Sequence, residues 1–369
     1  MSYSKLTTWE AVALVLVIIT NHLVTNMPQS ILKLCGSSSI LNILFVSVIA
    51  FFFTLLIVKL FQHFTNSDII DVSHYLGGKW LQTILGILLI LYLLLITSTL
   101  LRNFSEGLKI AYLEKAPIYL ILLFFLVVCF IANRLGERVI IKTNVIVSVI
   151  ILISLVITFL SALPNITVQR MFPILGYGAN QTFFSGLSNL FAFNSLLYLF
   201  FLMPMLEKKE NFKKVSLISF FITSLLLLLA IASLLLSFSY IQSVEELSPV
   251  YLIITNTSFG KFFQRPESLF ILTWILSLMT YLNVAVLFIL KILRKITKIK
   301  SSKPFLLPVT LAILIVALLP SNMASIRWIE NIFYKYSTLF ITFLLCFSIL
   351  IAANIKHYYK NRKQKKEEN

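Results

Sequence analysis

Five polar side chains interrupt an apolar segment near the start of the chain, in the sequence LVIITNHLVTNMPQS of residues 16–30. They are Thr20, Asn21, His22, Thr25 and Asn26, and Pro28 follows them. We expect the last four of these polar side chains to line an opening in the helix. Asparagine and threonine compete with a helical backbone for its hydrogen bonds. An interruption in a membrane helix frees N–H and C=O groups that can hold the charged ends of a small zwitterion. The stretch therefore predicts a ligand site. Alternatively, these side chains bond neighbouring helices within a continuous span, and His22 is a ligand contact, a proton-sensitive group or a structural histidine.

A second polar interruption, FAFNS at residues 191–195, lies in a later apolar segment. Gly186 comes shortly before it, and Pro204 follows it much as Pro28 follows the first interruption. Corresponding interruptions in two halves of a chain are typical of transporters that bind solutes near the membrane midplane. We expect this segment to face residues 16–30 across the site through Phe191, Phe193, Asn194 and Ser195.

Two further polar stripes could line the same cavity. The first has spacings of seven, four and three residues, which place its members on one helical face; they are Tyr92, Thr99, Asn103 and Glu106. The second consists of Thr273, Ser277 and Thr280, with Trp274 and Tyr281 nearby. We expect Tyr92, Trp274 and Ser277 to contact a ligand. Hydrogen bonding between helices is the alternative for both stripes.

The composition is that of a membrane protein. Of the 369 residues, 59% are hydrophobic and 12% are charged, and the mean hydropathy is +0.94. Apolar runs of about 20 residues, the length that crosses a bilayer, recur along the chain. The net charge of +17 lies mainly in short loops and in the tail at residues 357–369. Such a tail contacts anionic lipid, so nucleic acid is not an expected partner.

Ten membrane spans are predicted, at 9–33, 40–61, 81–103, 117–133, 139–162, 181–206, 215–239, 267–291, 304–320 and 332–356. With a cytoplasmic N-terminus, 22 of the 31 Lys and Arg residues fall on the cytoplasmic side. This bias predicts that both termini are cytoplasmic and that the number of spans is even.

Ten spans divide into two sets of five, and an odd number per set makes the second enter the membrane from the opposite side. The chain is thus predicted to be one all-α transmembrane domain, residues 1–369, built as a 5+5 inverted repeat. Repeat one covers about 9–162 and repeat two about 181–356, with discontinuous helices at 9–33 and 181–206.

No pattern of an enzyme or a metal site is present. The three cysteines and four histidines are scattered, and there is no P-loop, no G-x-S-x-G, no metal-ligand pair at helical spacing and no pair of carboxylates that we expect to be buried. We expect no catalytic residue, metal or cofactor. No carboxylate is predicted at the centre of a span, which argues against an ion-driven carrier. Backbone carbonyls can nevertheless hold sodium.

Several segments, in order, resemble the permease-like B subunit of bacterial spore germinant receptors, within the amino acid–polyamine–organocation transporter superfamily. They are TTWE at 7–10, LLRNFSEGLKIAYLEKAP at 100–117, RMFPILGYGANQTFFSG at 170–186 and SPVYLIITNTSFGKFFQRPESLFILTWILSL at 248–278. The resemblance implies a ten-helix LeuT-like fold, a place in the spore inner membrane, and two partners, a larger A subunit and a lipoprotein C subunit. That family commonly has small residues or glycine where the first helix breaks, whereas residues 11–34 contain no Gly.

The expected function is nutrient sensing, typically of an amino acid, in a transporter-like cleft that triggers germination. The alternative within the same fold is a genuine amino acid or amine permease. An enzyme embedded in the membrane is a third hypothesis, but the sequence offers no reactive constellation for it.

Overall fold

The structure, a computed structural model, describes residues 5–25, 27–238, 253–254 and 267–367. Within these residues every regular element is a helix, apart from one isolated β-bridge between Leu6 and Leu206. The α-helices are α1 Thr8–Val24, α2 Met27–Cys35, α3 Ser39–Phe61, α4 Ile69–Ala111, α5 Ile118–Leu135, α6 Glu137–Leu160, α7 Leu196–Leu202, α8 Phe212–Ser237, α11 Glu267–Thr297, α12 Lys303–Leu318, α13 Met323–Trp328, α14 Lys335–Thr338 and α15 Phe347–Glu367.

Seven helices are long and apolar enough to cross a membrane, and an eighth span is counted if Asn180–Phe193 and Leu196–Met205, which meet at 42°, form one bent span. Two shorter apolar helices, α1 and α12, add to these. The prediction of an all-helical multi-pass protein is therefore confirmed. The count of ten spans and the division into two repeats stay predictions.

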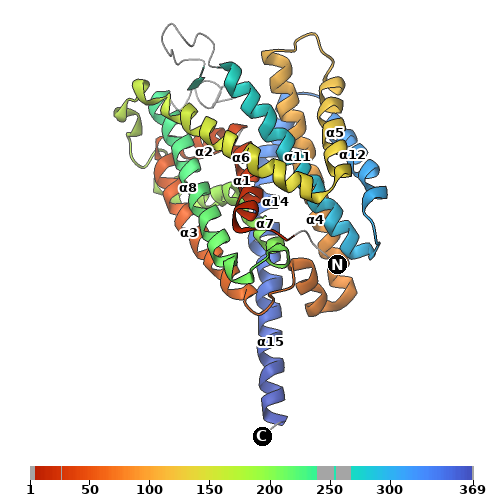
Figure 1. The fold of residues 1–369 in the computed structure, drawn as a ribbon. Helices are drawn as coiled ribbons and strands as arrows, with labels where there is room; N and C mark the ends of the chain where they lie inside the picture. Colours follow the sequence, from red (N-terminus) through yellow and green to blue (C-terminus); the bar gives the residue numbers. More distant parts are fainter. Residues whose placement is uncertain (1–4, 26, 239–252, 255–266, 368–369) are drawn as a thin grey trace.

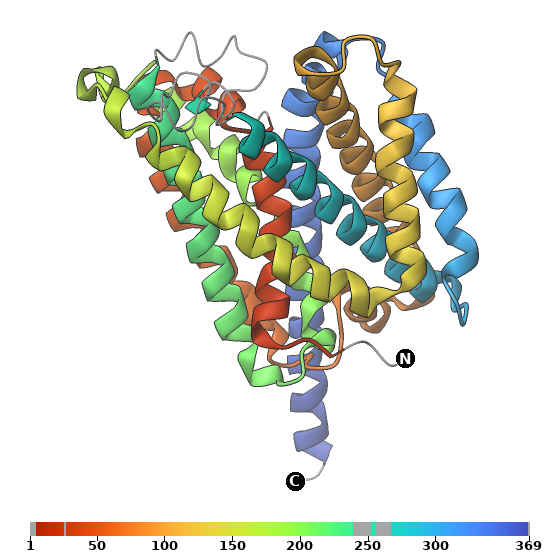
Figure 2. The same cartoon turned by 45° about the horizontal axis from the view of Figure 1, so that its top comes forward.

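The helices form two groups with α14 and α15 between them (Figures 1 and 2). One group contains α1, α2, α3 and α8, and the other contains α4, α5, α11 and α12 (Figure 1). Helix α6 joins the groups because it packs against α1 and α8 on one side and against α11 on the other. Both chain ends lie on the same side of the molecule, which we call the terminus face, and α15 extends beyond the body there (Figures 1 and 2).

Helix α4 extends beyond its predicted span of 81–103 at both ends, and it has two parts. It begins with a capping box, in which Asp68 accepts hydrogen bonds from the N–H groups of Ile70 and Asp71. The backbone then leaves the helical conformation at Gly77 and Gly78. Gly78 has φ of +68°, a left-handed conformation that glycine adopts without the steric cost of a side chain. The first part, Ile69–Leu76, therefore forms an additional helical segment before the span.

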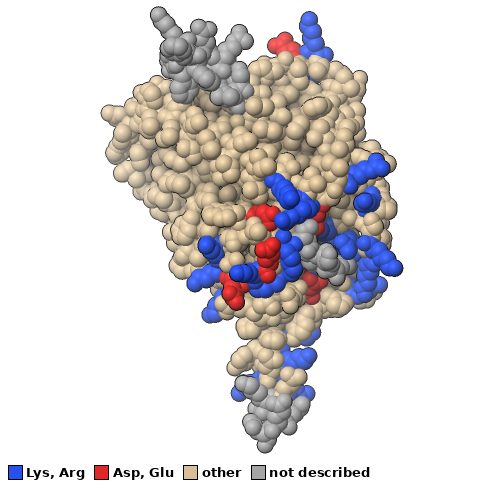
Figure 3. All heavy atoms as spheres, viewed as in Figure 1, with Lys and Arg blue, Asp and Glu red and all other residues tan. Residues whose placement is uncertain are grey.

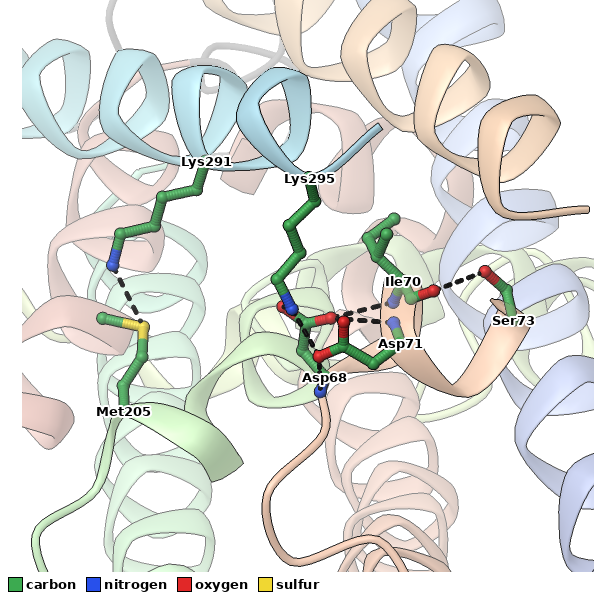
Figure 4. Close-up of polar contacts among 7 residues, drawn as sticks. All are labelled: Asp68, Ile70, Asp71, Ser73, Met205, Lys291 and Lys295. Carbon is green, nitrogen blue, oxygen red and sulfur yellow. Dashed lines mark hydrogen bonds and ion pairs between the residues drawn. The ribbon is translucent and has the colours of Figure 1, made fainter. Parts of the chain in front are cut away.

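The terminus face is held together by ion pairs and a backbone bridge. Many of the described Lys and Arg side chains gather towards this face, with acidic side chains among them (Figure 3). Lys295 of α11 contacts both Asp68, at 2.6 Å, and Asp71, while Lys291 contacts Glu137 at 2.7 Å (Figure 4 shows the two lysines). The segment before α1 is fixed as well, since Leu6 N–H donates to the Met205 carbonyl at 2.8 Å.

The TTWE segment has a structural role in this arrangement. The Thr7 hydroxyl accepts a hydrogen bond from Glu10 N–H, and the Glu10 carboxylate accepts one from Thr7 N–H at 2.8 Å. This capping box starts α1. Glu10 also pairs with Arg138 at 3.1 Å, which ties the start of α1 to the start of α6.

Candidate functional site

The first interruption lies between α1 and α2. Thr25 has φ −88° and ψ −132°, outside the helical region. Its hydroxyl donates to the carbonyls of Asn21, at 3.2 Å, and His22, at 3.1 Å, so it satisfies groups at the end of α1. The helix resumes at Met27. Asn26, which we expected to line the opening, lies outside the described residues.

The second interruption differs in kind. A π-helical segment, Asn180–Phe184, leads into an unusually long 3-10 segment, Ser185–Phe193, and α7 begins at Leu196. Asn194 and Ser195 keep right-handed helical backbone angles at the junction. The predicted change in helical structure at FAFNS is therefore present, but it is a change of helical winding with a bend and not an unwound stretch.

The 3-10 segment requires glycine at position 186. A Cβ atom there would lie 2.2 Å from the Asn42 Nδ2 atom and 3.0 Å from the Gln181 carbonyl oxygen. The Asn42 side chain cannot easily give way, because its Nδ2 donates to the Thr182 carbonyl and its Oδ1 accepts from Asn189, both at 2.8 Å. Gly186 thus permits the close approach of the 3-10 segment to α3.

Gly186→Ala is expected to lower the free energy of unfolding by about 1–3 kcal/mol, the usual cost of overpacking. Three free, buried cysteines, Cys35, Cys129 and Cys346, allow unfolding of the purified protein to be followed with a thiol-reactive dye. Leu187→Ala is the control, because the neighbouring Leu187 side chain is exposed. If Gly186→Ala unfolds at the wild-type temperature, the close approach to α3 does not constrain the segment.

A buried cluster centred on Tyr334 joins the two interruptions. Asn194 Nδ2 donates to the Tyr334 hydroxyl at 2.5 Å, and that hydroxyl lies 3.2 Å from His22 Nε2. The His22 and Tyr334 rings are stacked, with centroids 5.0 Å apart, and Phe191 meets Tyr334 edge-on at 5.7 Å. Residues predicted from two distant segments are therefore brought together by a third residue that the sequence analysis did not select.

A cavity lies against this cluster. It has an empty volume of about 450 Å³, its open side included, but only a small part of this space is wide enough to hold a water molecule. Its walls are mostly apolar and aromatic, with a few polar groups, and consist of His22, Thr25, Met27, Ser30, Leu95, Ile96, Thr99, Leu100, Phe191, Ile329, Glu330, Phe333 and Tyr334. This combination is typical of a small-molecule site.

A larger hollow lies next to the cavity, and Leu95, Thr99 and Ile329 line both. That hollow is also lined by residues at the end of α12 and in α13, including Pro320 and Trp328. These parts of the chain lie on the side of the molecule opposite the terminus face (Figure 2).

The last membrane segment contributes residues that were missed. After α13 the helix widens into π-helical turns over Ile329–Tyr334, and it does so again over Leu339–Cys346. The first wide segment brings Glu330 and Tyr334 to the cavity, and Asn103 Nδ2 donates to Glu330 Oε1 at 2.9 Å. Glu330 is only 9% exposed, and it lies near the start of this helix, which begins at Met323, so the prediction that no carboxylate lies at the centre of a span stays a prediction. Our predicted span began at 332, two residues too late to include it.

The predicted site residues fall into two sets. His22, Thr25 and Phe191 line the cavity, and Asn194 joins them through Tyr334. The others are buried elsewhere. The Tyr92 hydroxyl bonds the Thr338 hydroxyl at 2.8 Å, Phe193 stacks on Phe220, and Trp274 packs against Phe104. Within the described residues, the polar side-chain atoms of Asn21 and Ser277 are buried without a hydrogen-bond partner, and Ser195 is buried beside the bend.

Comparison with known proteins gives a family and a fold. A family model described as "Spore germination protein" matches residues 5–326. No curated protein matches the sequence. Among solved structures, a Na+-coupled sialic acid symporter, described as substrate-bound and outward-open, is similar with a TM-score of 0.67 at 11% identity, over 95% of this chain and 89% of that one. A mutant of the Eremococcus coleocola manganese transporter has a TM-score of 0.54 at 14% identity, over 94% of this chain and 76% of that one.

The solved structures are transporters of the LeuT fold, so at these identities they establish the fold alone. Together, the family match and the fold point to a transporter-like membrane protein and not to an enzyme. The segment 248–278, which carried much of the resemblance stated above, lies largely outside the described residues.

Proposed function

We propose that this chain, which belongs to the spore germination protein family, is the nutrient-sensing subunit of a germinant receptor and binds its ligand in the cavity beside Tyr334. The observation that carries the proposal is the convergence of the two helix interruptions on that cavity. Residues from the first interruption, the second interruption and the last membrane segment all contribute to its walls. A solute bound there contacts three segments at once.

The narrowness of the cavity supports a sensing role. A solute as large as an amino acid needs lining side chains such as Phe333 and Tyr334 to move aside. A ligand shifts a conformational equilibrium only through its different affinity for the two states. A ligand can occupy the cavity only when these side chains have moved. Binding therefore favours a conformation of the protein that differs from the conformation without ligand.

The remaining parts of the proposal rest on the family resemblance and on the charge distribution. They are the spore inner membrane as location, an A subunit and a lipoprotein C subunit as partners, an amino acid as ligand, and cytoplasmic termini. The excess of Lys and Arg near the terminus face supports the orientation. Of these parts, the ligand is the one that substitutions in this chain can test.

Thr99→Phe tests the site. Thr99 lines both the cavity and the larger hollow, so an aromatic ring there takes up space that the ligand would occupy. The spores tested contain a single germinant receptor, and this chain is its B subunit. In these spores we expect the nutrient concentration for half-maximal germination to rise about tenfold or more, equivalent to at least about 1.4 kcal/mol. The nutrient is chosen beforehand from a panel of amino acids, sugars and nucleosides.

Thr83→Phe is the matched control. Thr83 is on the same helix and, like Thr99, donates its hydroxyl to the carbonyl four residues earlier, but it does not line the cavity. Equal responses of both variants and wild type would place the ligand outside this cavity. Immunoblots must show similar protein levels for the comparison to count.

A permease of the same fold is the second candidate, and Glu330 is the observation that favours it. Ionisable groups within membrane segments often mark the path of a substrate or ion. Uptake of labelled nutrient into proteoliposomes separates the two functions. Concentrative uptake by the purified chain would establish transport, whereas binding without uptake would leave the sensing role.

A further inference from the structure

We propose that the larger hollow beside the cavity binds an acyl chain of a membrane phospholipid. The inference goes beyond the proposed function, because it concerns a second site and a second class of ligand. The hollow has an empty volume of about 1030 Å³, its open side included, and seven of its ten lining residues are apolar.

The hollow is a gap between two helices that both pack against a third. Helix α4 packs against α12 and against α13, and it contributes Leu95 and Thr99 to the wall. Leu319, directly after α12, and Trp328, at the end of α13, line the hollow as well. Both of these side chains are more than half exposed, so the hollow opens to the surroundings of the protein.

Stripes of exposed apolar and aromatic side chains lead to the hollow along the helices around it. Along α12 the stripe consists of Leu307, Leu311, Ile315 and Leu319. Along the last membrane segment it consists of Trp328, Ile332, Tyr336, Phe340 and Leu344. Along α4, Ile84, Leu88 and Leu91 lead to Leu95. Positions three or four apart share one face of a helix. In a membrane protein such faces contact lipid tails, so the surface that lipid covers is continuous with the hollow.

The polar groups in the wall do not call for a polar occupant. The Thr99 hydroxyl donates to the Leu95 carbonyl at 2.8 Å, and the Ser325 hydroxyl donates to Asn322 Oδ1 at 3.0 Å. The third hydroxyl is that of Ser321, which is exposed. Apolar atoms beside an empty space lose dispersion contacts, and a hydrocarbon chain restores them. The hollow therefore favours a hydrocarbon occupant.

The depth of the hollow matches an acyl chain. Leu95 lies eight residues, or about 12 Å of helix, before the end of the predicted span at 81–103. One leaflet of the hydrocarbon core is about 15 Å thick. Trp328 is a residue type enriched at the level of the lipid headgroups. An acyl chain in the hollow contacts Leu95, Thr99 and Ile329, so lipid lies behind one wall of the ligand cavity.

Photolabelling of the purified full chain in phosphatidylcholine nanodiscs tests the inference. A small fraction of the lipid carries a diazirine near the end of one acyl chain, and mass spectrometry identifies the labelled residues after illumination. We expect labelling of the α12 stripe and also of Thr99, which is only 7% exposed. The same lipid with the diazirine on its headgroup should not label Thr99, because only the chain enters the hollow.

Ala324→Trp fills the hollow with an indole ring, since Ala324 lines it. We expect this variant to reduce labelling of Thr99 about tenfold or more, equivalent to at least about 1.4 kcal/mol of binding, and to leave labelling of the α12 stripe unchanged. Ala111→Trp is the control, because Ala111 is likewise an exposed alanine, at the end of α4, and does not line the hollow.

Labelling of the α12 stripe without Thr99 in wild type would overturn the inference, and this result needs no variant to fold. Undiminished labelling of Thr99 in Ala324→Trp would overturn it as well, because the chain would then reach Thr99 by another way. If a diazirine fatty acid labels Thr99 and the phospholipid does not, the hollow binds a free acid and the assignment to phospholipid is wrong.

Discussion

Lys295→Met is expected to lower the free energy of unfolding by about 3–5 kcal/mol, the typical cost of removing one partner from a buried ion pair. Lys295 and Asp68 have side chains that are each only 7% exposed, and they are 2.6 Å apart. Asp71 contacts the same ammonium (Figure 4). Removing the lysine leaves the buried Asp68 carboxylate without this ammonium and beside the carboxylate of Asp71, whose side chain is 37% exposed, at the point where α4 begins.

The cost of Lys295→Met should depend on pH. Burial raises the pKa of Asp68 to about 6 in the folded protein, above its ordinary value near 4, while the Lys295 ammonium opposes this shift. Without the lysine the pKa of Asp68 rises further. An acid whose folded pKa is raised binds a proton on folding, so the variant regains stability as the pH falls. The difference from wild type should therefore be larger at pH 8 than at pH 5.

Thermal unfolding followed by the intrinsic fluorescence of the four tryptophans measures both effects at either pH. Lys300→Met is the control, because Lys300 is exposed and has the same charge. Asp68→Asn combined with Lys295→Met should recover part of the loss, since it removes one of the stranded charges. A variant as stable as wild type at pH 8 would show that the cluster does not hold α4 and α11 together.

The first helix interruption was predictable because its cause is local. Asn21, Thr25 and Asn26 are poor helix formers grouped within one apolar run, and the structure ends α1 at Val24. No glycine is needed, because Thr25 closes the helix end with its own hydroxyl. At the second interruption the sequence indicated the position, but not the 3-10 winding. That winding depends on packing of Gly186 against Asn42, a residue 144 positions earlier.

The last membrane segment was not predictable in the same way. A π-helical segment shifts the register of every side chain that follows it, so a periodicity of 3.6 residues assigns the wrong face. Glu330 was further excluded by a span placed to begin at 332. A charged residue at the end of a hydropathy window is easily assigned to a loop. The spacing of four between Glu330 and Tyr334 was the available signal.

The predicted residues that lie away from the cavity follow another pattern. Tyr92 and Trp274 were selected as polar or aromatic residues at mid-span, yet each packs between helices, against Thr338 and Phe104 respectively. Helix-to-helix bonding and ligand contact place the same residue types on the same helical faces. The two roles are distinguished only by how the neighbouring helices are arranged. The spacing of residues within one helix gives no information on that arrangement.

Asn194→Leu is expected to raise the nutrient concentration for half-maximal germination more than tenfold, with a small loss of stability. The side chain positions Tyr334 through the 2.5 Å hydrogen bond to its hydroxyl, and Tyr334 both stacks on His22 and forms a wall of the cavity. Leucine cannot make that bond, so the tyrosine ring is free to rotate into the cavity. The carbonyl oxygen of the Asn194 side chain has no hydrogen-bond partner within the described residues. The stability cost is thus limited to about one hydrogen bond, near 1 kcal/mol.

A double-mutant cycle with Tyr334→Phe tests whether the effect passes through that bond. If Asn194 acts by positioning Tyr334, the double variant should respond much as Asn194→Leu alone does, with a coupling of about 0.5–3 kcal/mol between the two positions. Asn165→Leu is the control, because Asn165 is exposed in a distant turn. Unchanged germination in Asn194→Leu, at wild-type protein levels, would exclude the Tyr334 cluster from ligand recognition. Additive effects of the two substitutions would instead assign Asn194 a direct contact with the ligand.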